Sequence, residues 1–246
     1  MFKVSVCMAT YNGEHYIEKQ LTSILSQINP EDEVIVVDDA SEDRTLNIIE
    51  NLVDDRIKII ALESNVGHVQ AFEKAISTAS NEIIFLSDQD DIWHPSKYKT
   101  VLEEFRSEES PVLLVHGLSA INSKGQVITK NWLTLPKACL SGIPFLIAEL
   151  IKPRIFGSAS AFRRSILEIM LPFPISVYAH DHWLTICAAI TGKSKFLNKN
   201  LVYRRIHDHN LTPKNGNTFF KKIYFRILFF CMICRAVIRK ISIKRN

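Results

Sequence analysis

An alternation of buried strands and amphipathic helices over the first 90 residues constrains the fold of this chain more than any other feature. Apolar runs typical of buried strands span residues 4–10, 33–37, 56–61 and 83–86. The segments between them carry apolar residues at helical spacing. Because strands that alternate with helices form a parallel sheet with helices on its faces, we expect an α/β protein with a Rossmann-like, mostly parallel central sheet.

Weaker signals extend this outline. Ser41 is expected to cap the helix after the second strand, because serine favours helix N-caps. Strands are expected at 112–115 and 118–122, and a helix at 145–151. Without repeats or a clear linker, the predicted organisation is one domain over residues 1–212 and a C-terminal tail over residues 213–246.

The composition is that of an ordinary globular protein. With 246 residues, 47% of them hydrophobic and 23% charged, the chain can bury a substantial core. Its five cysteines are odd in number and scattered, and no signal-peptide pattern opens the sequence. These features predict a reducing, cytoplasmic environment.

The net charge of +4 is unevenly distributed. Residues 211–246 contain nine lysines and arginines and no acidic residue, which leaves 21 basic against 26 acidic residues in the first 210. Proteins that bind nucleic acid need an excess of positive charge to neutralise phosphates. We therefore expect no nucleic-acid partner for the body of the chain.

Three carboxylates follow the fourth expected strand within four positions: Asp88, Asp90 and Asp91. Such a cluster alone is more often a solvated turn than a site. However, polar residues also end the first two strands, and the carboxyl ends of parallel strands meet where such sheets bind ligands. Hard cations such as Mg²⁺ are bound by carboxylates together with substrate phosphates. The cluster therefore predicts a metal-nucleotide site.

Four motifs occur in order along the chain: residues 4–13 (VSVCMATYNG), residues 36–41 (VVDDAS), residues 87–93 (SDQDDIW) and residues 180–183 (HDHW). Together they resemble a family 2 glycosyltransferase of GT-A fold. The acidic cluster and residues 203–207 (YRRIH) are similar to the bacterial rhamnosyltransferase-like branch, which builds surface polysaccharide. The resemblance runs from residue 4 to about residue 212.

The resemblance implies a nucleotide site formed by Thr10, Tyr11, Asp39, Asp88 and Gln89. Asp39 would accept the imide N–H of uracil or thymine, which suits an acceptor-only carboxylate. The alternatives are that Asp39 caps the following helix and that Tyr11 seals the edge of the sheet. Asp38 is expected to be structural.

The resemblance also implies the residues of the transfer step. Asp90 and His207 would hold Mg²⁺ or Mn²⁺, and Asp181 would act as the general base of an inverting displacement. The residue before this base is often Glu in the family, where this chain has His180. The alternatives for Asp181 are a helix N-cap or the partner of a cation. Asp91 is expected to shape the turn, and its alternatives are a further, water-mediated ligand of the cation and the cap of a helix beginning near residue 96.

The tail predicts a basic amphipathic helix over residues 219–241. Its apolar run is too short to span a bilayer. Its apolar face comprises Phe219, Phe220, Ile223, Ile227, Phe230, Cys234, Val237 and Ile241. We expect this face to lie on an anionic membrane, and the alternative is a helix docked on the domain or buried in a homodimer.

These features predict an inverting, metal-dependent glycosyltransferase that is peripheral on the inner face of the membrane. Its donor would be a UDP- or dTDP-sugar, with rhamnose among the candidates, and its acceptor a lipid-linked saccharide. Two alternatives are a catalytically silent nucleotide-binding scaffold and a nucleotidyltransferase.

Overall fold

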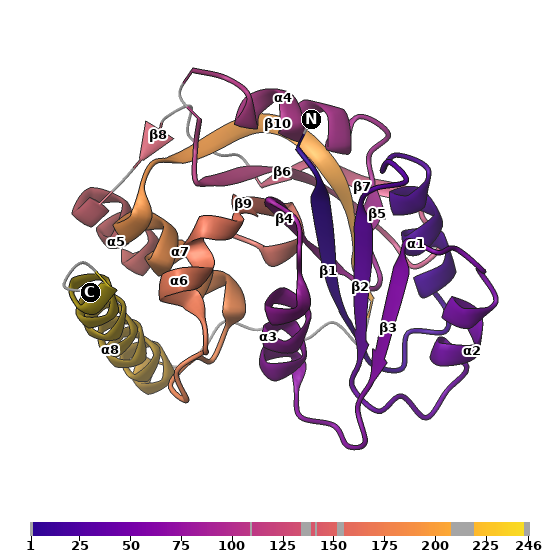
Figure 1. Ribbon diagram of the computed structural model, residues 1–246, viewed down its shortest axis with the longest axis horizontal. Coiled ribbons are helices and arrows are strands. Elements are labelled where there is room, and N and C mark those ends of the chain that lie inside the picture. Colours follow the sequence, from indigo (N-terminus) through magenta and orange to yellow (C-terminus); the bar gives the residue numbers. More distant parts are fainter. Residues whose placement is uncertain are drawn as a thin grey trace.

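A mixed sheet of ten strands runs through the molecule, with helices on both faces (Figure 1). The strand order is β3-β2-β1-β4-β9-β6-β10-β5, with β7 paired to β6 and β8 to β10. The structure, a computed structural model, describes residues 2–108, 110–133, 139–140, 142–151, 155–207 and 219–243.

The N-terminal half is the predicted parallel unit. Its strands are β1 (Val4–Thr10), β2 (Glu33–Asp38), β3 (Ile57–Ala61) and β4 (Ile83–Asp88), and its helices are α1 (Ile17–Leu25), α2 (Thr45–Glu50) and α3 (His68–Thr78). β1 pairs in parallel with both β2 and β4, and β2 pairs in parallel with β3. The predicted strand and helix alternation is thus confirmed.

The second half adds the antiparallel pairings. In chain order it contains β5 (Ile92–Trp93), α4 (Lys97–Phe105), β6 (Leu113–Ile121), β7 (Val127–Leu133), β8 (Cys139–Leu140), α5 (Gly142–Ile151), η1 (Gly157–Ala159), β9 (Ser160–Arg163), η2 (Arg164–Ile166), α6 (Leu167–Met170), α7 (His180–Thr191), β10 (Ser194–Arg205) and α8 (Phe219–Ile243). The expectation of two strands at 112–122 was wrong. They form the single strand β6, which is buried throughout between β9 and β10.

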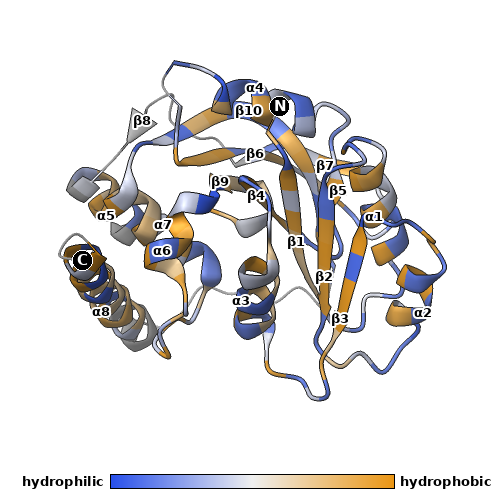
Figure 2. Ribbon diagram, in the orientation of Figure 1, coloured by the Kyte–Doolittle hydropathy of each residue, from blue (hydrophilic) through white to orange (hydrophobic). Residues whose placement is uncertain are grey.

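The sheet separates two hydrophobic cores, and hydropathic colouring shows apolar residues concentrated along the central strands (Figure 2). One core contains Phe72 of α3, Trp183 of α7 and Met232 of α8. The other contains Leu21 of α1 and Phe105 of α4. The carboxyl ends of β1, β2 and β4 are therefore held on a rigid, doubly covered sheet.

The C-terminal helix α8 packs against α7 and α6. Arg239 of α8 donates hydrogen bonds to the carbonyl oxygens of Ile169 and Met170, at 2.8 and 3.3 Å, and Lys240 donates to that of Ile190 at 3.2 Å. Among the helices that the structure describes, none has the length and apolar character needed to cross a membrane.

Candidate active site

The parallel register brings the polar strand ends together. Thr10 is the partner of Asp38 across β1 and β2, and Ala9 is the partner of Asp88 across β1 and β4. The first two motifs and the acidic cluster therefore lie at one edge of the sheet, as the sequence predicts.

Asp38 ties the first two strand ends together. Its carboxylate accepts hydrogen bonds from Thr10 Oγ1 at 2.9 Å and from Ser41 Oγ and N at 2.6 and 2.8 Å. Asp38 is fully buried and Thr10 nearly so, so the Thr10 hydroxyl is directed into the protein. The expectation that Ser41 caps a helix was wrong: α2 begins at Thr45, and Ser41 instead holds Asp38 and accepts the N–H of Asn12.

Asp39 links the end of β2 to the start of α3. Its two carboxylate oxygens accept the backbone N–H groups of Val66 and Gly67, at 2.7 and 2.9 Å. The turn that supplies these donors has Gly67 at φ 89°, a conformation that glycine adopts without strain. The carboxylate thus fixes the turn before α3, and not the helix after Ser41. Each oxygen retains a lone pair for a ligand donor.

Tyr11 and Gln89 form a paired contact between the ends of β1 and β4. Gln89 Oε1 accepts the Tyr11 N–H at 2.9 Å, and Gln89 Nε2 donates to the Tyr11 carbonyl at 3.0 Å. Gly13 makes room for this amide, because a Cβ there would lie 2.5 Å from Gln89 Oε1. The Tyr11 side chain is 43% exposed, so its ring is accessible to a ligand while its backbone is fixed.

The acidic turn after β4 contains carboxylates in different environments. Burial and the neighbouring charge of Asp90 raise the pKa of Asp88 to about 6. Burial also raises the pKa of Asp91 well above its usual range. Asp91 Oδ1 accepts the backbone N–H of Arg205 at 3.0 Å, so Asp91 joins the turn to β10 and does not cap α4.

Asp90 and His207 meet at this edge. His207 Nε2 lies 2.7 Å from Asp90 Oδ2, and both side chains are largely buried, at 11% and 15% exposure. The Arg205 guanidinium donates to the Asp90 carbonyl at 2.8 Å and lies over the Tyr16 ring. Tyr16 in turn packs beside His207, with ring centroids 5.1 Å apart. The two predicted metal ligands are therefore adjacent and held from several sides.

This pair fits a divalent cation. Two neighbouring ligands of an octahedral Mg²⁺ ion lie roughly 3 Å apart, close to the separation of Asp90 Oδ2 and His207 Nε2. Within the described ranges no group of three or more His, Cys, Asp or Glu residues is arranged to hold an ion. Mg²⁺ commonly takes few protein ligands and completes its shell with phosphate and water oxygens.

Lys97 is a component of the site that the sequence did not reveal. It is fully buried, its Nζ donates to the Ser158 carbonyl at 2.8 Å, and it lies 4.3 Å from the centroid of the Trp93 ring. Burial lowers the pKa of Lys97 to about 7, although the charges of Asp91 and Asp88 oppose this. It connects the acidic turn with η1. A lysine at the start of a helix is usually exposed, so the sequence carried no signal of this role.

Asp181 lies in the first turn of α7, half-buried. Its Oδ1 accepts the N–H of His182 at 2.8 Å. The N-cap of α7 is Ala179, so the N-cap alternative for Asp181 was wrong. Its charge adds a small contribution to the raised pKa of Asp88, so the two carboxylates lie within electrostatic range of each other.

His180 precedes Asp181 and is wedged between two elements. Its ring stacks on Phe72 at a centroid distance of 4.0 Å, and a Cβ on Gly157 would lie 2.5 Å from its Nε2. Burial lowers the pKa of His180 to about 4, so the ring is neutral at physiological pH. Gly157 therefore permits the close approach that seats the start of α7.

Comparison with protein families shows to which family the chain belongs. The family model "Glycosyl transferase family 2" matches residues 5–170. The chain belongs to this family. An uncharacterised glycosyltransferase of Nostoc sp. is 31% identical over 216 residues, covering 85% of this chain and 66% of the relative. The predicted family is thus confirmed, while Asp181 and His207 lie beyond the matched residues.

Other relatives share shorter regions. The putative teichuronic acid biosynthesis glycosyltransferase TuaG of Bacillus subtilis is 36% identical over 52% of this chain and 51% of its own length. The dTDP-rhamnosyl transferase RfbG of Shigella flexneri is 36% identical over 39% of this chain and 36% of its own length. The chain therefore spans less than two thirds of these relatives, of which TuaG is named for teichuronic acid biosynthesis and RfbG for dTDP-rhamnosyl transfer.

A solved structure confirms the fold. Staphylococcus aureus TarS, residues 1–349 in complex with UDP-GlcNAc, superposes with a TM-score of 0.71 over 98% of this chain and 73% of that chain, at 21% identity. This likeness supports the predicted GT-A fold. Enzymes of family 2 with this fold generally depend on a divalent metal and take a nucleotide-sugar donor and a saccharide acceptor.

Proposed function

We propose that this chain is an inverting, metal-dependent glycosyltransferase that moves a sugar from a UDP- or dTDP-sugar to a lipid-linked saccharide in bacterial surface polysaccharide synthesis. The observation that carries the proposal is the 2.7 Å approach of His207 to Asp90 at the end of β4. Asp181 lies close enough to this edge to influence the pKa of Asp88. We therefore propose that the cation ligands and the base belong to one site.

In the proposed reaction, Asp181 accepts the proton of the acceptor hydroxyl as its oxygen attacks the anomeric carbon. The bond between this carbon and the departing diphosphate breaks as the new glycosidic bond forms, so the anomeric configuration inverts. Asp90 and His207 would hold Mg²⁺ or Mn²⁺. The cation would neutralise the charge that develops on the departing diphosphate.

The nucleotide would lie across the ends of β1 and β2. Asp39 would accept the imide N–H of uracil or thymine, and the exposed Tyr11 ring would stack on the base. Thr10 and Gln89 would act mainly by fixing these two residues, since the Thr10 carbonyl accepts the Asp39 N–H at 2.8 Å and Gln89 holds the Tyr11 backbone. Asp88 would accept a ribose hydroxyl.

The names of two relatives support this choice of substrates. RfbG is named a dTDP-rhamnosyl transferase, and WfgD of Escherichia coli, 30% identical over 53% of this chain and 48% of its own length, is named a UDP-Glc:alpha-D-GlcNAc-diphosphoundecaprenol beta-1,3-glucosyltransferase. A lipid-linked acceptor accords with a peripheral location at the inner membrane face. Residues 213–246 would form the membrane-associating unit beside a transferase domain of residues 1–212.

The test is release of nucleoside diphosphate from a panel of UDP- and dTDP-sugars with Mg²⁺ or Mn²⁺ and lipid-linked saccharide. Asp181→Asn should retain nucleotide-sugar binding and lower transfer about 10²- to 10⁴-fold, the usual contribution of a general base. The amide keeps an oxygen for the His182 N–H, so the fold should be retained. Asp55→Asn, a change at an exposed carboxylate, is the control.

Normal transfer by Asp181→Asn would refute the assignment of the base. Binding of nucleotide sugar without release of any product, across the whole panel, would instead support a catalytically silent scaffold.

A further inference from the structure

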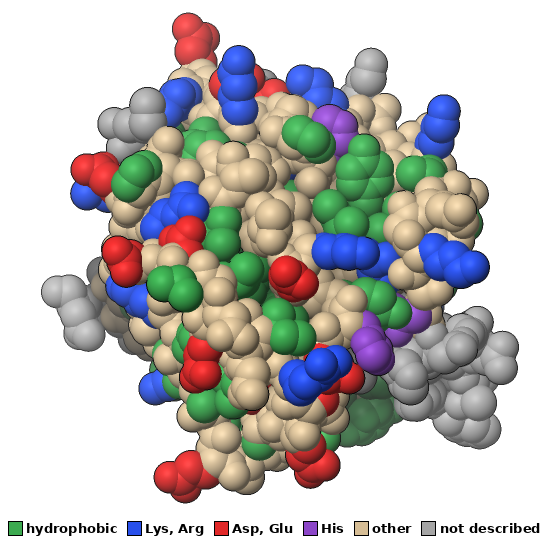
Figure 3. Space-filling model, turned by 90° about the vertical axis from the view of Figure 1, so that its right-hand side faces the viewer, with side chains coloured by type: hydrophobic (Ala, Val, Ile, Leu, Met, Phe, Trp, Pro, Cys, Tyr) green, Lys and Arg blue, Asp and Glu red, His purple; other side chains and the backbone are tan. Residues whose placement is uncertain are grey.

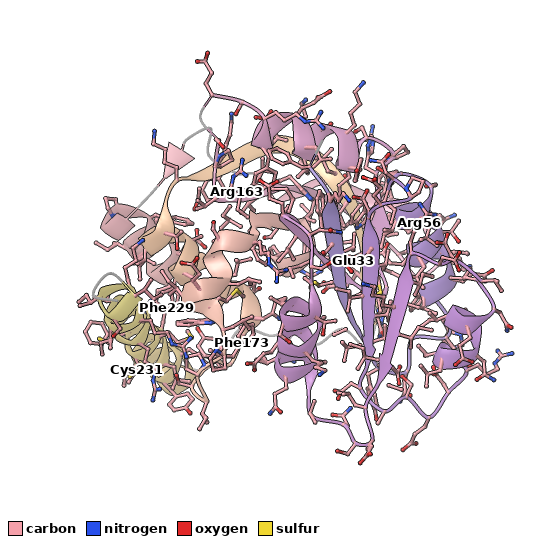
Figure 4. All side chains as sticks on the ribbon, in the orientation of Figure 1. Glu33, Arg56, Arg163, Phe173, Phe229 and Cys231 are labelled. Carbon is pink, nitrogen blue, oxygen red and sulfur yellow. The ribbon has the colours of Figure 1, made fainter. Side chains whose placement is uncertain are left out.

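Helix α8 has two apolar faces, of which one is buried against the domain and the other is exposed to solvent. On the inner face, Phe229 is 3% exposed, and Met232 and Ala236 are fully buried in the core shared with α7. On the outer face, Phe230 is 63% exposed and Ile238 is 62% exposed. Figure 4 shows Phe229 on the side toward the rest of the molecule and Cys231 on the other.

The outer face forms a continuous apolar stripe along the helix. This outer stripe consists of Tyr224, Ile227, Phe230, Val237, Ile238 and Ile241, which are 41% to 63% exposed. Ile227, Phe230, Ile238 and Ile241, together with the exposed Cys234 between them, follow one another at steps of three and four, so they share one side of the helix. Monomeric proteins rarely expose such a contiguous apolar surface without a partner.

The charge on α8 indicates the kind of partner. Residues 219–246 contain eight lysines and arginines and no acidic residue. Arg226 and Arg235 are exposed, whereas Arg239 and Lys240 contact carbonyl groups of the domain. By contrast, the side of the molecule away from α8 carries side chains of both charges interspersed (Figure 3).

Two such helices facing each other would bring like charges together, which opposes a dimer through this surface. An anionic bilayer offers both an apolar layer for the stripe and phosphates for the arginines.

We propose that the outer stripe of α8 inserts into the headgroup region of an anionic membrane while its inner face stays docked on α7. The location at the membrane rests on the proposed function. In this arrangement the outer stripe meets the lipid, and the exposed Arg226 and Arg235 bind lipid phosphates beside it.

The docked face connects the membrane surface with the base. Phe225 of α8 packs on Tyr178, with ring centroids 4.7 Å apart, and Tyr178 Oη lies 2.7 Å from His182 Nδ1. His182 follows Asp181 and also packs near Phe229, at 6.0 Å. Lipid-bound α8 therefore presents the base-bearing end of α7 near the surface where a lipid-linked acceptor resides.

The test uses the full chain, because removing α8 would open the core. A stripe variant (Ile227→Gln, Phe230→Gln, Ile238→Gln) and a charge variant (Arg226→Gln, Arg235→Gln) are compared with the wild type by flotation. The vesicles are phosphatidylcholine with or without one third phosphatidylglycerol. Val53→Gln with Ile128→Gln, at positions 89% and 53% exposed elsewhere, is the matched control.

The wild type and the control should float with anionic vesicles only. The stripe variant should remain soluble, and each arginine replaced should lower partitioning about fivefold, an effect that salt diminishes. Thermal unfolding should be unchanged in all variants, since every altered side chain is exposed.

Equal flotation of wild type and stripe variant would overturn the proposal. So would a wild-type dimer, measured by light scattering, that the stripe variant converts to a monomer. Nucleotide-sugar hydrolysis without vesicles separates this inference from the proposed function. If the stripe variant hydrolyses nucleotide sugar normally but no longer floats, the outer stripe is the membrane-binding surface. If the wild type floats normally but has no transfer activity, only the proposed function is contradicted.

Discussion

His207 Nε2 lies 2.7 Å from Asp90 Oδ2, although 117 residues separate them in the chain. This contact joins the acidic turn after β4 to the segment that follows β10. It is supported by the Arg205 guanidinium, which donates to the Asp90 carbonyl. A cation bound here would be held jointly by both halves of the sheet.

The first prediction concerns metal-dependent nucleotide binding. Asp90→Asn should abolish the part of UDP or dTDP binding that depends on Mn²⁺ and lower the rate of transfer at least about 100-fold. His207→Ala should lower the rate of transfer about 10-fold. Calorimetric titration with and without metal measures the binding. His15→Ala, at a side chain 77% exposed, is the control. Metal dependence that persists in Asp90→Asn would place the cation elsewhere.

The second prediction compares two adjacent phenylalanines on α8. Phe229→Ala removes a side chain that is 3% exposed and should lower the free energy of unfolding by about 3 kcal/mol. Phe230→Ala removes one that is 63% exposed and should change it by less than about 0.5 kcal/mol. Urea unfolding measures both. Equal effects would mean that α8 does not dock through the face described.

The sequence predicted the N-terminal half of the site well, because its order is local. The spacing of apolar residues marks each strand, and the polar residues that follow mark its end. Parallel pairing then brings Thr10, Asp38 and Asp88 to one edge of the sheet. The individual hydrogen bonds were less predictable. Asp39 and Ser41 have chemistry suited to helix caps, and only the tertiary structure shows which backbone N–H groups they reach.

Contacts between distant segments could not be predicted from the pattern. Lys97 is buried because η1, from 60 residues later in the chain, supplies the Ser158 carbonyl. Likewise, Phe229 and Phe230 are identical in hydropathy, and a helical wheel cannot decide which of two apolar sides meets the domain. That choice depends on α7, whose packing surface is itself a product of the fold.

The third prediction concerns stability in acid. Burial alone would raise the pKa of Glu33, but hydrogen bonds from Lys58, Ser5 and Ser80 outweigh it and lower the pKa to about 2. The stabilisation is therefore fully present above about pH 4.5, the ordinary value, and is lost as the pH falls toward 2. Figure 4 shows Glu33 on β2, within the sheet.

Glu33→Gln should lower the free energy of unfolding at pH 7 by roughly 2 to 3 kcal/mol and flatten its dependence on pH between these limits. Urea unfolding across this range is the measurement. Glu31→Gln, at a side chain 71% exposed, should leave the dependence unchanged. A slope in Glu33→Gln as steep as that of the wild type would assign the acid sensitivity to other groups.

The last prediction concerns the approach of Gly157 to His180. Gly157→Ala would place a methyl group 2.5 Å from His180 Nε2, a distance that real contacts do not reach, while Phe72 stacks on a face of the same ring. The imidazole must shift, and with it the first turn of α7 that carries Asp181. Transfer should fall about 10-fold or more, because small displacements of catalytic groups are costly. Stability should fall by about 1 to 3 kcal/mol, while affinity for UDP or dTDP should be retained.

A second substitution distinguishes steric displacement from loss of the glycine itself. In the double variant Gly157→Ala with His180→Ser, the smaller side chain leaves room for the methyl group, so the two stability losses should be clearly non-additive. Strict additivity, or wild-type transfer and stability in Gly157→Ala alone, would show that the ring at position 180 moves freely. The start of α7 would then be positioned by its contacts with α8 and not by η1.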